Sequence, residues 1–113
     1  MSSGLTRRHC VPCEAGTPPI PPQDAERLAA QVPGWELRPD EQKLVRRFKF
    51  KDFKEAMAFV NRVADLAEAE GHHPDIHVSW NRVRLELTTH AIKGLSENDF
   101  ILAAKISEMN DKP

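Results

Sequence analysis

The chain has 113 residues, of which 29% are charged and 40% apolar, and its 16 basic and 17 acidic side chains leave a formal net charge of −1. This composition predicts a single globular domain with one modest core. It argues against a general nucleic-acid or anionic-membrane binder, which needs a basic excess, and no apolar run reaches the roughly 18 residues of a membrane helix.

Residues 1–22 differ in composition from the rest of the chain. Five of the nine prolines lie there, and proline at this density removes backbone donors and fixes φ. We therefore expect a partly flexible, proline-rich arm over residues 1–22 and a single domain over residues 23–113. The start of the chain has no apolar signal segment, and two cysteines do not make a disulfide framework, so a cytoplasmic location is expected.

The arm contains the pair Cys10-x-x-Cys13, with His9 beside it. This spacing is half of a zinc-ribbon pattern, but a structural zinc needs four ligands and the chain has no second pair. Zinc at Cys10 and Cys13 would need ligands from elsewhere in an oligomer. A redox pair is disfavoured because the spacing occurs in a proline-rich arm and not at a strand–helix junction.

The first half of the domain predicts a helix followed by two strands. A short helix is expected from about residue 24, and Pro33-Gly34 ends it. Residues 35–37 resemble a short strand. Residues 44–50 alternate between apolar and polar side chains, which predicts a strand with one polar face.

The second half predicts a long helix, two strands and a final helix. Residues 53–70 form the clearest helix, with Asp52 as N-cap and Gly71 as its C-terminal stop. Its expected buried stripe is Phe53, Met57, Val60, Val63, Ala64 and Ala67. Two strands around Asn81-Arg82 follow, and a helix over about 97–109 begins after Ser96. The order α-β-β-α-β-β-α predicts an α+β fold, with a four-stranded antiparallel sheet and three helices on one face.

Four of the five histidines lie between positions 72 and 90. Histidine is the side chain whose ordinary pKa lies nearest neutrality, so such a cluster suits proton transfer. With Asn81-Arg82 as a two-residue loop, every apolar residue of the two strands faces an apolar partner. The same register places His73 opposite His90, where the Cβ atoms of paired residues lie about 4.5–5.5 Å apart.

Other interpretations of these residues stay open. Three histidines can hold a catalytic zinc ion, although adjacent histidines on a strand point apart. His77 is expected to pair across the strands with Glu86 as an ordinary surface pair. The basic cluster of Arg46, Arg47, Lys49 and Lys51 is interpreted as a solvated strand face, with nucleic-acid contact as a minor alternative.

Several segments closely resemble the pterin-4a-carbinolamine dehydratases. They are Glu70-Gly71-His72-His73-Pro74-Asp75-Ile76, Trp80-Asn81-Arg82-Val83, Leu87-Thr88-Thr89-His90 and Lys93-Gly94-Leu95-Ser96-Glu97-Asn98-Asp99. The resemblance covers about residues 24–108, and the arm is similar to that of bacterial members that act alongside phenylalanine hydroxylase.

The resemblance implies dehydration of 4a-hydroxytetrahydrobiopterin to quinonoid dihydrobiopterin, which recycles the pterin cofactor of aromatic amino-acid hydroxylases. It implies no metal or organic cofactor, and a homodimer or homotetramer with an aromatic amino-acid hydroxylase as a possible partner. The catalytic residues that it implies are His72, His73 and His90. Those expected to contact substrate are Pro74, Glu68, Trp80, Thr89 and Asp99. No nucleic-acid or membrane partner is expected.

The alternative is a non-catalytic oligomeric binding module that acts as a transcriptional coactivator, as some animal members of that family do. Turnover of a carbinolamine pterin without added metal would distinguish the enzyme from this module.

Overall fold

The computed structural model describes residues 4–10 and 18–111. The long elements are α1 (Pro22–Ala29), β1 (Glu36–Arg38), β2 (Lys43–Lys49), α2 (Phe53–Glu70), β3 (Asp75–Ser79), β4 (Arg82–Leu87) and α3 (Glu97–Asp111). Two short 3-10 turns, η1 (Gly4–Arg7) and η2 (His90–Ile92), precede α1 and α3. The α+β class and the order α-β-β-α-β-β-α are confirmed.

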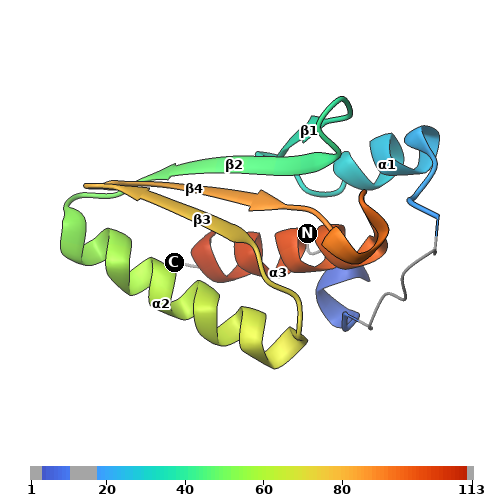
Figure 1. The fold of residues 1–113 in the computed structure, drawn as a ribbon. Helices are drawn as coiled ribbons and strands as arrows, with labels where there is room; N and C mark the ends of the chain where they lie inside the picture. Colours follow the sequence, from blue (N-terminus) through green and yellow to red (C-terminus); the bar gives the residue numbers. More distant parts are fainter. Residues whose placement is uncertain (1–3, 11–17, 112–113) are drawn as a thin grey trace.

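The four strands form one antiparallel sheet in the order β1-β2-β4-β3. Strands β2 and β4 pair along six residues at its centre, so β3 lies at an edge. Helices α2 and α3 lie against one face of the sheet, and α1 lies beside β1 (Figure 1). The core between these layers is apolar and includes Phe59, Leu85 and Phe100, all of them fully buried. No helix in the described part of the chain is long and apolar enough to cross a membrane.

Helix α2 has the predicted bounds because its caps are strong. The Asp52 carboxylate accepts a hydrogen bond from the Glu55 amide, and Gly71 ends the helix in the left-handed conformation with φ 67°. The predicted apolar stripe is partly wrong. The buried residues are Ala56, Phe59, Val63 and Ala67. Phe53, at the very start of the helix, is 50% exposed.

The predicted register of the last two strands is wrong by two residues. The structure pairs Ile76 with Leu85 and Val78 with Val83, so the loop is Trp80-Asn81 and not Asn81-Arg82. A shift of two residues leaves every side chain on its original face, so the apolar pattern fits both registers equally well. The structure's register requires a positive φ at Trp80, which is 54°, and bulky residues rarely adopt this conformation.

Contacts outside the hairpin hold this loop. The buried Asn81 side chain donates to the Phe50 carbonyl at 2.9 Å, and the Phe50 amide donates to the Asn81 carbonyl at 2.8 Å. These bonds to Phe50, the residue that follows β2, favour the observed turn.

Candidate functional site

A buried carboxylate at the start of α3 binds one histidine of the doublet. The Nε2 atom of His72 lies 2.6 Å from Oδ1 of Asp99. Oδ2 of Asp99 accepts from the Thr89 hydroxyl at 2.8 Å and from the Ser96 amide at 3.0 Å. The Asp99 side chain is fully buried and 12% of the His72 side chain is exposed. All three acceptor bonds are therefore made inside the protein.

Two helix ends bring these residues together. At the end of α2, the His72 amide donates to the Ala67 carbonyl across the left-handed Gly71, and this turn directs the chain toward α3. At the start of α3, Asp99 is the third helical residue and its carboxylate caps the Ser96 amide, as in a capping box. Asp99 therefore caps α3 and binds His72 at the same time.

The second histidine of the doublet lies in a more open environment. His73 Nε2 is hydrogen-bonded to the Glu68 carboxylate, and more than half of each side chain is exposed. Pro74 follows, half-buried, directly before β3. The structure therefore brings Glu68 to His73 and Asp99 to His72, as two separate carboxylate–histidine pairs.

His90 begins the short turn η2 and does not pair with His73. Strand β3 starts only at Asp75, so His73 lies outside the sheet and the predicted pair of His73 and His90 is wrong. Instead, Thr89 and Gly94 close a small loop through two backbone hydrogen bonds, at 2.9 and 3.3 Å. The exposed His90 ring makes no hydrogen bond or ion pair with the described residues. Thr89, the residue before His90, donates to the Asp99 carboxylate that also binds His72. The backbone at His90 is therefore held near the His72–Asp99 pair.

Within one chain, Trp80 lies far from His72 and His73. It lies at the loop end of β3, whereas His72 and His73 precede the other end, and five residues of strand span about 16 Å. Its side chain is 68% exposed.

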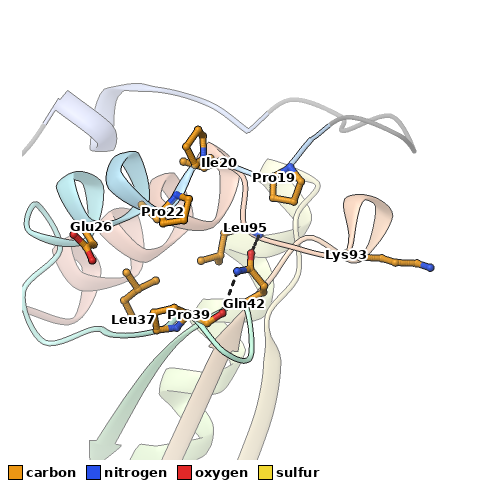
Figure 2. A pocket seen from close by; sticks show the side chains of 11 residues that line it. Pro19, Ile20, Pro22, Glu26, Leu37, Pro39, Gln42, Lys93 and Leu95 are labelled. Atoms are coloured by element: carbon orange, nitrogen blue, oxygen red, sulfur yellow. Dashed lines mark hydrogen bonds between the residues drawn. The ribbon is translucent and has the colours of Figure 1, made fainter.

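A pocket of about 360 Å³ lies behind the His90 loop. Figure 2 shows prolines and aliphatic side chains around it, with the amide of Gln42 bridging the pocket wall. Gln42 donates to the Pro39 carbonyl at 3.0 Å and accepts from the Leu95 amide at 3.4 Å. None of the sequence-predicted site residues lines this pocket.

Cys10 is half-buried and bonded within the protein. Its amide donates to Glu70 at 2.9 Å, and its thiol donates to the Asn98 carbonyl at 3.6 Å. Burial, together with the Glu70 charge, raises the pKa of the Cys10 thiol to about 12, so it is not a reactive thiolate near neutral pH. Cys13, its predicted partner, lies outside the described residues. Within the described ranges no three metal-binding side chains are grouped to hold an ion.

The surface predictions are confirmed only in part, because His77 is not paired directly opposite Glu86 and Arg46 does not belong to the solvated strand face. His77 lies opposite Arg84 in the observed register, and its Nε2 is 3.7 Å from the Glu86 carboxylate, a diagonal neighbour. Arg47, Lys49 and Lys51 are exposed. Arg46 is not part of that solvated face, because it donates to the Ser107 hydroxyl at 2.8 Å and its guanidinium lies 4.6 Å from the centre of the Phe48 ring.

Sequence reasoning missed three contributors near the site: Ser96 as a donor to Asp99, Gln42 behind the His90 loop, and Glu70 beside Cys10. The Ser96-x-x-Asp99 spacing carries the capping signal that could have identified the first. For Gln42 and Glu70 the sequence carries no local signal, because their partners lie 53 and 60 residues away.

Comparison with known proteins finds one matching family model and several relatives that are similar over most of the chain. The sequence model of the family Pterin 4 alpha carbinolamine dehydratase matches residues 18–109. A family member from Methylococcus capsulatus is 50% identical over 105 residues, which are 93% of this chain and 92% of that relative. Pterin-4-alpha-carbinolamine dehydratase 2, a mitochondrial protein of Arabidopsis thaliana, is 50% identical over 109 residues, 93% of this chain and 58% of its own length.

Solved structures agree with the sequence relatives. A transcriptional coactivator/pterin dehydratase from Brucella melitensis superposes with a TM-score of 0.76 at 31% identity, over 80% of this chain and 97% of that one. A pterin dehydratase-like protein identified as a RuBisCO assembly factor in the alpha-carboxysome superposes with a TM-score of 0.60 at 25% identity. The match covers 71% of this chain and 93% of that one. The chain therefore belongs to the pterin-4-alpha-carbinolamine dehydratase family.

Proposed function

We propose that this protein dehydrates 4a-hydroxytetrahydrobiopterin to quinonoid dihydrobiopterin by acid–base catalysis with His72, His73 and His90. The observation that carries this proposal is the hydrogen bond between His72 and the fully buried Asp99 carboxylate. Family membership supplies the substrate class.

The reaction needs one proton donor and one proton acceptor. The lone pair of N5 forms the N5=C4a double bond as the C4a–O bond breaks, the leaving hydroxyl takes a proton to become water, and N5 gives up its proton to a base. Each well-placed acid or base contributes roughly 10²- to 10⁴-fold to the rate. Two histidines of opposite protonation therefore suffice.

The Asp99 contact favours His72 as the base. A carboxylate only accepts hydrogen bonds, so it holds the proton of a neutral His72 ring on Nε2. The lone pair of Nδ1 is then available to take the N5 proton. His73 and His90, whose rings are more exposed, are the candidates for the acid. This replaces the sequence-based pairing of His73 with His90, which depended on the incorrect register.

The test is direct turnover. 4a-Hydroxytetrahydrobiopterin is generated in the cuvette by an aromatic amino-acid hydroxylase, and formation of the quinonoid product is followed with and without the purified protein. We expect acceleration that is unchanged when the purified protein is first treated with a chelator and then freed of it, so that the chelator does not act on the hydroxylase. Loss of activity with the chelator would favour the zinc alternative, and product formation at the spontaneous rate would refute the proposal.

We also propose that the protein is a homodimer or homotetramer that recycles pterin for an aromatic amino-acid hydroxylase in the cytoplasm. Strand β3 is an edge strand with unpaired backbone groups. Val78 within it is 38% exposed, and Trp80, which directly follows it, is 68% exposed. Such an edge is suited to a second copy. Light scattering should give a mass of two or four times 12.8 kDa, and Trp80→Ser should lower it. A monomeric wild-type protein would refute this assignment.

A protein-binding role is the second candidate. The same exposed edge could hold another protein, and the Brucella melitensis relative is described as a coactivator as well as a dehydratase. His72→Ala separates the two roles, because it should abolish turnover and leave binding through β3 intact.

A further inference from the structure

Residues 4–10 lie outside the span that the family model matches, residues 18–109. They nevertheless pack on the domain. Leu5 is only 3% exposed and belongs to the apolar core, and η1 contacts α3, as the blue segment in Figure 1 shows. We call residues 4–10 the N-terminal strap.

The end of the strap bridges α2, which ends two residues before His72, and α3, which contains Asp99. On the α2 side, the Cys10 amide donates to Glu70 at 2.9 Å and His9 Nδ1 lies 3.1 Å from the same carboxylate. On the α3 side, the Cys10 thiol donates to the Asn98 carbonyl, and Arg8 forms an ion pair with Glu97.

These contacts lie directly beside the pair in sequence. Glu70 is the last residue of α2, two positions before His72, and Asn98 immediately precedes Asp99. The strap therefore joins the two backbone segments whose separation determines the 2.6 Å distance between His72 Nε2 and Asp99 Oδ1.

A buried ion pair fixes the strap. Lys105 Nζ on α3 donates to Glu70 at 2.8 Å, and the two side chains are 13% and 7% exposed. Burial alone would raise the pKa of Glu70, but the hydrogen bonds from Lys105, the Cys10 amide and His9 outweigh it and lower the pKa to about 2. Glu70 thus stays charged and receives donors from α3 and from the strap together.

We propose that the N-terminal strap, held by Glu70 and Lys105, is a positioning element that keeps His72 aligned on Asp99, and that Glu70 is a positioning residue. Its effect on turnover rests on the proposed dehydratase function, whereas its effect on the His72 ring does not. A misplacement of about 1 Å can lower a catalysed rate by about 10²-fold, so the strap can matter to catalysis without touching substrate.

Glu70→Gln tests the proposal, because it places an amide N–H or a neutral oxygen against the Lys105 ammonium and weakens the junction. We expect kcat to fall by about 10- to 100-fold with a smaller change in KM, and the ¹⁵N signals of the His72 ring to shift. Leu5→Ala should produce the same two changes, since it loosens the strap without altering Glu70.

The matched control is Glu86→Gln. Glu86 also accepts from a lysine, Lys43 at 3.1 Å, and its pKa is also lowered, but its side chain bonds to residues of the sheet and to neither the strap nor the His72–Asp99 pair. This variant should leave kcat and the His72 signals unchanged.

Hydrogen exchange at the strap amides reports whether each variant has released the strap. If the strap amides of either variant exchange faster than in the wild type while the His72 ring signals stay unchanged, the proposal is overturned. If the wild-type protein shows no dehydratase activity, the proposed function fails, and the His72 signals alone then decide whether the strap positions the ring.

Discussion

The Asp99→Asn substitution should test the role of the buried carboxylate with almost no change in shape. The Ser96 amide is a fixed donor, so the amide oxygen of an asparagine must face Ser96. Its NH₂ group then faces His72 Nε2 and can only donate. A neutral His72 would have to carry its proton on Nδ1, and the lone pair proposed to act as the base would be lost.

The structure indicates the size of the effect. The substitution replaces a charge-assisted bond to His72 at 2.6 Å by a neutral one, and hydrogen bonds to charged groups contribute about 1.5–3 kcal/mol against about 1 kcal/mol for neutral ones. Stability should therefore fall by about 1–2 kcal/mol. The dehydration rate should fall by about 10²- to 10⁴-fold, which is the contribution of a general base.

Both quantities can be measured on one preparation. Urea unfolding gives the stability, and initial rates with 4a-hydroxytetrahydrobiopterin give kcat. Asp24→Asn, at the exposed first turn of α1, is the matched control and should leave both near wild type. A folded Asp99→Asn protein with undiminished kcat would show that the tautomer of His72 does not matter to turnover.

Three further predictions concern single residues. His90→Ala should reduce the dehydration rate by about 10²-fold or more and change the unfolding free energy by less than about 0.5 kcal/mol, because the ring is exposed and unbonded among the described residues; a normal rate would remove His90 from the mechanism. Gly71→Ala should cost about 1–2 kcal/mol in urea unfolding, since its φ of 67° is left-handed, and an unchanged midpoint would contradict that cost. Glu70 has a pKa lowered from 4.5 to about 2, so its charge stabilises the fold above pH 4.5 and this contribution is lost as the pH falls toward about 2; acid unfolding of Glu70→Gln should lack that component, and identical acid profiles would disprove it.

The sequence carries strong local signals for most of the fold. Asp52 and Gly71 determine both ends of α2 through caps that act within a few residues. The faces of β3 and β4 follow from period-two alternation, and they were predicted correctly even though the register was not.

What could not be predicted depends on contacts distant in sequence. The hairpin sequence does not predict the left-handed backbone conformation of Trp80. The Asn81 side chain that favours this turn bonds to Phe50, which is 31 residues away. The resemblance singled out both His72 and Asp99, but their contact spans 27 residues and two elements. Only the structure shows that Asp99 is hydrogen-bonded to His72 and Glu68 to His73.

The location of bound pterin tests the central claim most directly. A crystal structure with 7,8-dihydrobiopterin should place the ring within hydrogen-bond reach of His72 Nδ1, about 2.6–3.2 Å, with His73 and His90 bordering it. A ring bound instead in the pocket lined by Gln42 and Leu95, with the three histidines unoccupied, would contradict the acid–base account.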